Sequence, residues 1–255
     1  MIFDTHMHTI LSSDSQMEIA DLIESKNILN IGTILTEHVD FNYPDPNLFR
    51  ADIDNFFKSY SKYRDSSLLL GVEIGLSSSI VEKNKNLISS YPFDYVIGSI
   101  HSIKDIDIYS FFDTNNMEKE EFFKTYFEEG IKYIKEFDDF DSLGHIDYPC
   151  RYCNYENNEF TLKEHEHYLK KLFKILIDKK KVLELNTRRL NNPKVYNALL
   201  PVYKLYKNLG GKYVTLGSDA HEAKSIGVNF KLAKRFLEET DLIPVYFQNR
   251  IMKSS

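Results

Sequence analysis

Short apolar segments alternate with longer amphipathic segments along almost the whole chain. A short apolar run is typical of a buried strand, and apolar residues that recur every three or four positions indicate a helix packed on one side. The predicted strands are Met1–Phe3, Ile31–Leu35, Leu68–Ile74, Tyr95–Ile100, Ser142–Ile146, Val182–Leu185 and Tyr213–Leu216. The predicted helices are Gln16–Lys26, Asn47–Tyr63, Ser78–Ser89, Glu118–Phe137, Leu162–Lys179, Pro193–Leu209 and Phe230–Glu239.

This alternation predicts an α/β fold with one parallel sheet. Seven strand–helix units follow one another without a linker rich in Pro, Gly or Ser, so we expect a single domain of residues 1–255. At this length a closed barrel is favoured over an open sheet, although the alternation alone fits both.

Composition and charge limit the classes of partner. The chain has a net charge of −6 and two cysteines, which exclude a fold built on disulfides and indicate a reducing compartment; we therefore expect a cytoplasmic protein. No apolar segment reaches the roughly 20 residues that cross a bilayer, and the N-terminus lacks the pattern of a secretory signal. We expect no membrane partner. The charge gives no reason to expect a nucleic-acid partner, although bound metal ions could supply positive charge that the count misses.

Histidines gather at the ends of the predicted strands. Six of the eight histidines end a strand or follow one: His6, His8, His38, His101, His145 and His221. Three carboxylates accompany them: Asp14, Glu73 and Asp219. Since the C-terminal ends of parallel strands meet at one mouth of a barrel, these side chains are expected to share one site.

This set of residues favours metal binding. Each histidine alone would be an ordinary hydrogen-bonded ring, but six histidines with three carboxylates favour ligation. Nine ligands are too many for one ion and fit two or three divalent ions, and imidazole with carboxylate suits zinc, iron or manganese. The other two histidines, His165 and His167, lie two positions apart in a predicted helix and so face different ways; we expect both on the surface.

The same residues stand in motifs that resemble those of the PHP family (polymerase and histidinol phosphatase), and within it the histidinol-phosphate phosphatases. The motifs are Asp4-Thr-His-Met-His8, Thr36-Glu-His38, Gly71-Val-Glu73, Gly98-Ser-Ile-His101, Gly144-His-Ile-Asp147, Glu184-Leu-Asn186 and Gly217-Ser-Asp-Ala-His221. They extend along nearly the whole chain. The resemblance implies a distorted (β/α)7 barrel, similar to a TIM barrel, with three metal ions at the C-terminal face of the strands.

The resemblance also implies which residues hold each ion. The first ion would be held by His6, His8, Glu73 and Asp219. The second would be held by Glu73, as a bridge, with His101 and His145. The third would be held by Asp14, His38 and His221, with Asp14 where some relatives have histidine.

Two arginines resemble the substrate-binding arginines of the histidinol-phosphatase group. Arg151 follows the motif that contains His145, and Arg188 follows the motif that begins at Glu184. The next residue, Arg189, departs from the family pattern, in which a small residue is more usual. The sequence therefore leaves open whether Arg188 or Arg189 faces the site.

These features predict a metal-dependent phosphomonoesterase that binds a small phosphorylated substrate. The leading hypothesis is hydrolysis of L-histidinol phosphate to L-histidinol and phosphate, in histidine biosynthesis, by hydroxide that the ions activate. The predicted catalytic residues are Glu73, His101, Asp219 and His221. Glu37, like Asp40 and Glu184, is a candidate contact for the cationic part of the substrate, or else orients a ligand histidine.

Two alternatives stay open at this point. One is a PHP phosphoesterase that acts on a nucleotide, an oligonucleotide end or a phosphotyrosine. The other is a metal-binding module without catalysis.

Overall fold

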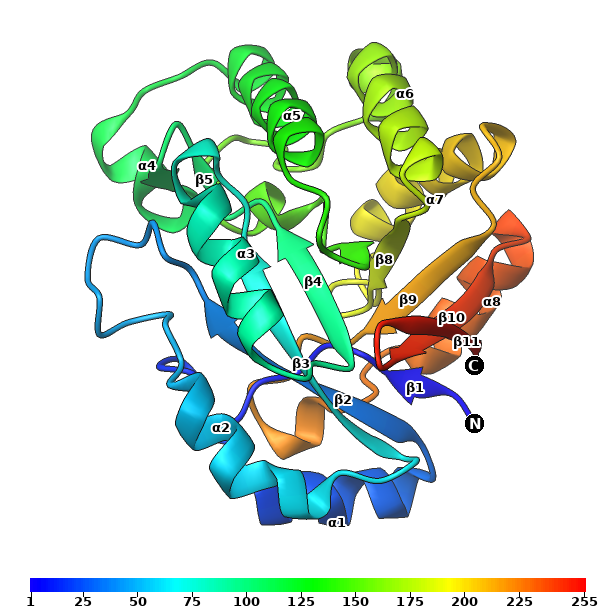
Figure 1. Cartoon of the computed structure of the whole chain (residues 1–255). Helices are drawn as coiled ribbons and strands as arrows, with labels where there is room; N and C mark the ends of the chain where they lie inside the picture. Colours follow the sequence, from blue (N-terminus) through cyan, green and yellow to red (C-terminus); the bar gives the residue numbers. More distant parts are fainter.

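Nine strands form one sheet in the computed structural model, which describes residues 1–255 except for the side chain of Thr114 (Figure 1). In spatial order the strands are β1 (Phe3–Asp4), β2 (Gly32–Val39), β3 (Leu68–Gly75), β4 (Tyr95–Ser99), β7 (Ser142–Leu143), β8 (Val182–Asn186), β9 (Tyr213–Gly217), β10 (Ile243–Gln248) and β11 (Ile251–Ser254). All neighbours from β1 to β10 are parallel, and β11 is antiparallel to β10. The predicted parallel α/β sheet is therefore confirmed, with all seven predicted strands in it.

The sheet closes into a distorted barrel at one end only. Backbone hydrogen bonds join Thr5 N to Leu216 O and Asp219 N to His6 O, each 2.8 Å long, and thereby bring the chain after β1 beside the end of β9. At the opposite end β9 pairs instead with β10. The closed end is the C-terminal end of the strands, where the predicted ligands were expected.

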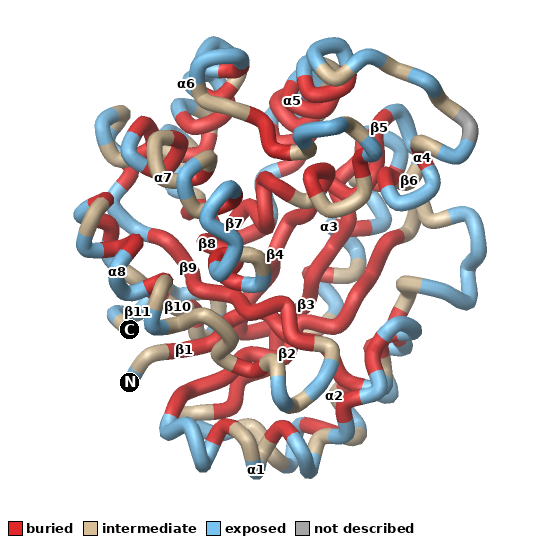
Figure 2. The backbone as a smooth tube through the Cα atoms, turned by 180° about the vertical axis from the view of Figure 1, so that it is seen from behind, coloured by how far each residue is buried: buried red, intermediate tan, exposed pale blue. Residues whose placement is uncertain are grey.

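Helices cover the outside of the sheet (Figure 1). They are α1 (Ile19–Leu29), α2 (Ile53–Tyr60), α3 (Val81–Ser90), α4 (Ile108–Thr114), α5 (Lys119–Glu136), α6 (Leu162–Asp178), α7 (Pro193–Asn208) and α8 (Phe230–Thr240). Short 3-10 helices are η1 (Ser61–Tyr63), η2 (Ser78–Ile80), η3 (Tyr148–Arg151) and η4 (Ala223–Ser225). Strands β2, β3, β4 and β8 are buried along their full length between the helices and the barrel interior (Figure 2), which explains their continuous apolar runs.

Local chemistry fixes several helix ends. The Thr161 hydroxyl accepts a hydrogen bond from Glu164 N and begins α6, and Pro193 occupies the first turn of α7. The helix predicted from Asn47 begins only at Ile53, after a loop. Among the described residues, no helix combines the length and the apolar character that a membrane span requires.

The prediction that His165 lies on the surface is wrong. Its side chain is buried, and its ring lies 5.7 Å from that of Phe123 and 5.5 Å from that of Phe127, measured between ring centroids. Burial lowers the pKa of this imidazole. His165 stands four residues before the buried Leu169, so the helical period places both on the inner face of α6. His167 is exposed, as predicted.

Two pairs of strands were not predicted. The hairpin of β5 (Ser102–Ile103) and β6 (Ile106–Asp107) has strands too short to show a period. The hairpin of β10 and β11 turns through Asn249 and Arg250, which both have the positive φ that a two-residue turn of this kind requires.

Arg250 fixes the β10–β11 hairpin to the end of the barrel opposite the ligands. Its Nε donates to Asp141 Oδ2 at 2.6 Å, its Nη2 donates to Asp139 Oδ1 at 3.0 Å, and its backbone N donates to Asp94 O at 2.8 Å. The Asp141 side chain is nearly buried, so it depends on this arginine for charge compensation.

We expect Arg250→Met to lower the free energy of unfolding by about 1–3 kcal/mol, because a charged hydrogen-bond partner of a buried carboxylate is lost. Urea unfolding at a fixed concentration of metal ion measures the change. An unchanged midpoint would contradict this role of Arg250, and the variant should keep its metal content, since the ligands lie at the other end of the barrel.

Candidate metal centre

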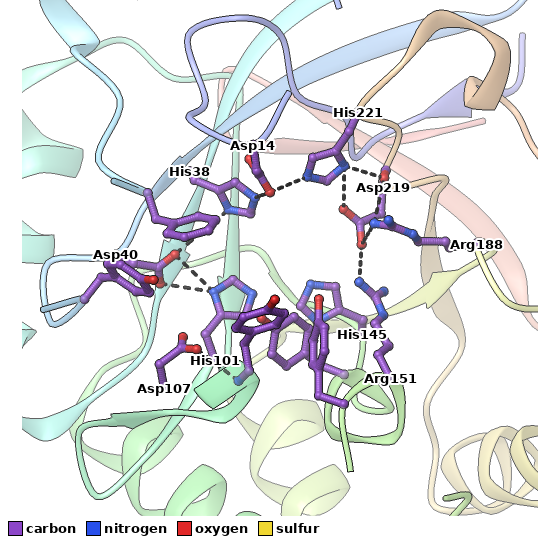
Figure 3. Close-up of a pocket in the computed structure, with 15 residues that line it drawn as sticks. Asp14, His38, Asp40, His101, Asp107, His145, Arg151, Arg188, Asp219 and His221 are labelled. Carbon is purple, nitrogen blue, oxygen red and sulfur yellow. Dashed lines mark hydrogen bonds and ion pairs between the residues drawn. The ribbon is translucent and has the colours of Figure 1, made fainter. Parts of the chain in front are cut away.

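A cavity of about 480 Å³ opens at the C-terminal ends of the strands (Figure 3). Six of the predicted ligands contribute to its wall: Asp14, His38, His101, His145, Asp219 and His221. His6, His8 and Glu73 lie directly behind them and are fully buried. The structure thus brings all nine predicted ligands into one cluster.

The carboxylate of Glu73, on β3, is at the centre of the cluster. Its Oε2 lies 3.1 Å from His6 Nε2 and 2.9 Å from His38 Nδ1. Its Oε1 lies 2.9 Å from His145 Nε2 and 3.3 Å from His101 Nε2. The two oxygens therefore face different histidines, as a carboxylate shared between two ions would.

Four ligand atoms surround one point beside Glu73 Oε2. His8 Nε2 lies 3.5 Å from this oxygen and 3.5 Å from Asp219 Oδ1. His6 Nε2 lies 3.1 Å from the same oxygen of Glu73 and 3.7 Å from Asp219 Oδ1. Ligands of a tetrahedral zinc ion with bonds of about 2.0–2.1 Å lie about 3.3–3.4 Å apart. The spacing of these four atoms fits one ion.

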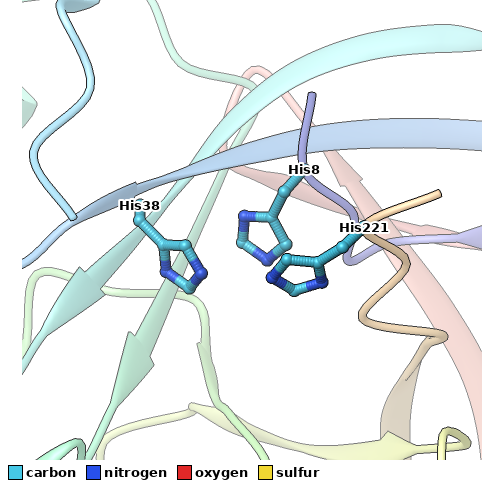
Figure 4. Close-up of side chains that lie close together, drawn as sticks. All are labelled: His8, His38 and His221. Atoms are coloured by element: carbon cyan, nitrogen blue, oxygen red, sulfur yellow. The ribbon is translucent and has the colours of Figure 1, made fainter. Parts of the chain in front are cut away.

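A third group lies at the outer edge of the cavity. Asp14 Oδ2 is 2.9 Å from His221 Nε2 and 3.5 Å from His38 Nε2. The ring of His8 stacks on that of His38, with 3.9 Å between centroids, and lies 4.4 Å from the ring of His221, so that the three rings converge (Figure 4). The Asp14 side chain is 34% exposed, so this group is reached from solvent.

Unpaired polar atoms mark the positions where ions would bind. Among the described residues, several buried side-chain atoms lie close to one another without forming a hydrogen bond: these include His6 Nε2, His8 Nε2, His38 Nδ1, His101 Nε2 and Glu73 Oε2. Buried polar atoms are rarely left unpaired in proteins. All five atoms point into the cluster, and imidazole and carboxylate are the donors that transition metals bind. The residues present therefore fit a site for more than one metal ion.

Without an ion, protons balance part of the negative charge in the cluster: burial would lower the pKa values of His6, His38 and His101, but the carboxylates around them raise these values well above normal. Burial would raise the pKa of Glu73, but His6, His38 and His101 hold it well below its usual value. Burial lowers the pKa of His8, and the neighbouring His38 and His221 lower it further, so its imidazole is neutral as ligation requires.

Carboxylates behind the cluster orient the histidines. Glu184 Oε1 lies 2.6 Å from His6 Nδ1, and Asp40 Oδ1 lies 3.1 Å from His101 Nδ1. Such partners fix the ring orientation of metal-binding histidines.

Glu37 lies outside the cavity, which corrects its prediction as a substrate contact. It is buried and accepts hydrogen bonds from Thr9 and from the Ser12 hydroxyl, which lies 3.5 Å from His8 Nδ1. Burial raises the pKa of Glu37 to about 7. Its position agrees with the alternative role, that of holding the loop beside a ligand histidine.

Two arginines reach the same carboxylate from different segments (Figure 3). Arg151, at the end of η3, donates from Nη1 to Asp219 Oδ2 at 2.6 Å, and its buried Nε and Nη2 have no hydrogen-bond partner among the described residues. Arg188, after β8, is 48% exposed and places Nη1 3.6 Å from the same oxygen. Arg189 turns away from the cavity, so Arg188 is the one that faces it.

The rest of the cavity wall is aromatic and acidic. It is formed by Asp40, Tyr43, Phe49, Asp107, Tyr109, Tyr148 and Tyr152. Burial raises the pKa of Asp107, which lies at the start of α4. Most of this wall was not predicted from the sequence, although Asp107 and Tyr109 follow closely on a strand end, where barrel enzymes carry their site residues.

Comparisons with known proteins identify the family. The PHP domain model matches residues 4–188. The chain is 45% identical over 253 residues to the probable histidinol-phosphatase of Clostridium acetobutylicum, which covers 99% of each chain. It is 29% identical over 243 residues to the histidinol-phosphatase of Lactococcus lactis, with 92% of this chain and 90% of that protein covered.

A solved structure gives the same result. The crystal structure of histidinol phosphate phosphatase from Lactococcus lactis, complexed with zinc, L-histidinol and phosphate, matches with a TM-score of 0.91 and 27% identity over 99% of both chains. Fold, motifs and full-length sequence similarity agree. The chain therefore belongs to the PHP domain family and, within it, to the histidinol-phosphatase group.

Proposed function

We propose that this chain, as a single domain of residues 1–255, hydrolyses L-histidinol phosphate to L-histidinol and phosphate, the histidinol-phosphatase reaction of histidine biosynthesis. The observation that carries the proposal is one cavity lined by metal-ligand atoms, by guanidinium donors and by an aromatic, acidic wall. In agreement, the relative from Lactococcus lactis has the same fold and holds zinc together with L-histidinol and phosphate.

The ligand atoms fit two or three divalent ions of zinc, iron or manganese. We assign His6, His8, Glu73 and Asp219 to the first ion. We assign Glu73, His101 and His145 to the second, and Asp14, His38 and His221 to the third. When bound, such ions lower the pKa of water to about 7 and stabilise negative charge on phosphoryl oxygens.

Arg151 and Arg188 supply donors for the phosphate. A guanidinium matches two phosphate oxygens in one plane. Arg151 lines the cavity, and its buried Nε and Nη2 have no hydrogen-bond partner among the described residues. Asp219 holds the Arg151 guanidinium in place from its Nη1 side. The donors are therefore positioned before substrate arrives, and they stabilise the charge that accumulates on the phosphoryl oxygens.

This aromatic and acidic wall suits the organic part of the substrate. Histidinol carries an ammonium group and an imidazole, both of which bind acidic and aromatic side chains. Asp40 is already paired with His101, so Asp107 is the carboxylate left for the ammonium group. Tyr148 and Tyr152 line the same cavity, and the Arg151 guanidinium lies over the Tyr148 ring, 5.4 Å from its centroid. The negative charge of this wall would repel the phosphates of an oligonucleotide. The wall therefore favours a substrate whose leaving group is small and cationic.

Substitutions should separate the metal ligands from the phosphate contacts. We expect His101→Ala to remove bound metal and abolish turnover. Arg188→Ala should keep the metal and lower kcat by about 10²- to 10³-fold, since one preorganised donor to the reacting group is lost. Metal content by elemental analysis and phosphate release measure the two effects.

The control for this pair is His167→Ala, because His167 is an exposed histidine remote from the cavity. It should retain both metal and activity. If His101→Ala and Arg188→Ala lost metal to the same extent, the assigned roles would be wrong.

A substrate comparison tests Asp107. We expect Asp107→Asn to lower kcat/KM for histidinol phosphate by about 10- to 100-fold, the value of one charged hydrogen bond. Turnover of propyl phosphate, which has no ammonium group, should change little. Asp113→Asn, at an exposed position of α4, serves as the control. An equal loss on both phosphates would argue against an ammonium contact at Asp107.

A further inference from the structure

The two phosphate-facing arginines belong to separate segments of the chain. Arg151 ends η3, which follows β7, whereas Arg188 lies in the turn between β8 and α7. Both must approach one phosphate from different directions. Their relative position therefore depends on what joins the two segments.

Arg189 makes this connection. Its Nη1 donates to Asp147 Oδ2 at 3.0 Å, and Asp147 is the residue that begins η3. Its guanidinium also pairs with Glu159, at the end of the loop that leads from η3 to α6. One side chain from the Arg188 turn thus holds the segment of Arg151 at both ends.

Charge adds a second reason for this arrangement. The side chains of Asp147 and Glu159 are 6% and 10% exposed, so two acids lie close together with little water. Lys119 reaches only the backbone carbonyl of Glu159. Asp147 stands four residues before Arg151, at the start of η3, and its charge acts on the Arg151 guanidinium together with that of Asp219. Without Arg189, Asp147 would compete with Asp219 for Arg151.

We propose that Arg189 is a positioning residue for phosphate binding: it neutralises Asp147 and Glu159, ties the η3 segment to the Arg188 turn, and so keeps Arg151 directed at the substrate phosphate. The inference rests on the proposed function, because it takes Arg151 as a phosphate ligand. It concerns a position at which the chain departs from the pattern of the family it resembles.

The test compares two arginines that make the same kind of ion pair at opposite ends of the barrel. Arg189 is 20% exposed and pairs with two carboxylates; Arg250 is 24% exposed and also pairs with two. Binding of inorganic phosphate to zinc-loaded protein, measured by calorimetry, is the readout, together with unfolding midpoints and kcat/KM for histidinol phosphate.

We expect Arg189→Met to weaken phosphate binding about tenfold, a coupling typical of contacting charged residues. Arg189→Lys should recover part of this loss. Arg250→Met should lower stability but change phosphate binding by less than about twofold, since distant sites act independently. In an Arg151→Met background, Arg189→Met should add less than about threefold, because the residue acts through Arg151. If Arg189→Met does not fold, Glu159→Gln gives the same comparison.

Unchanged phosphate binding in Arg189→Met would overturn the proposal. So would an equal loss in the Arg151→Met background, or an equal loss in Arg250→Met. Failure of the proposed function would give a different result. The native protein would then bind phosphate, and Arg189 and Arg151 would still be coupled in that binding, but the protein would not hydrolyse histidinol phosphate.

Discussion

The negative charge of Glu73 lies in the barrel, away from water, and the rest of the site is arranged around it. A carboxylate in such a place is costly unless positive charge and donors compensate it. Nitrogens of five histidines lie within 3.5 Å of its two oxygens, and the Ser99 hydroxyl donates to Oε1 at 2.6 Å. Those histidines come from four separate segments of the chain. Compensation of this one buried carboxylate therefore requires that strand ends from distant parts of the chain lie together. A parallel barrel brings them together.

The histidines in turn depend on a further layer of acids. Glu184 holds His6 through Nδ1 and also accepts a hydrogen bond from the backbone N of His145, at 2.7 Å. One carboxylate on β8 thus positions two strand ends of the cluster. With Asp40 on His101, the rings have fixed orientations that do not depend on the ions. Negative charge lies on both sides of the histidines, which explains why a chain can concentrate so many imidazoles in one buried place.

The sequence predicts the parts of this arrangement that depend on full burial. Strands such as β3 are buried on both faces, so their apolar runs are visible without a structure, and the polar residue that ends each run is then a site candidate. The β10–β11 hairpin was missed because half-exposed strands show only a weak pattern. The error at His165 has another cause: its spacing of four residues from Leu169 places both side chains on the buried face of α6, and the surface prediction did not use this spacing.

Arg188 and Arg189 show what no local pattern could have resolved. The two are identical and adjacent, and no preference of the backbone distinguishes them. Their directions are decided by partners 30 to 42 positions away: Asp147 and Glu159 attract Arg189, while Asp219 lies nearest to Arg188. The attraction between opposite charges is far stronger when they are shielded from water than when they lie at the surface. The two buried acids therefore determine which of the two arginines forms structural ion pairs. Arg188 occupies a partly exposed position, so its guanidinium remains available to face the cavity.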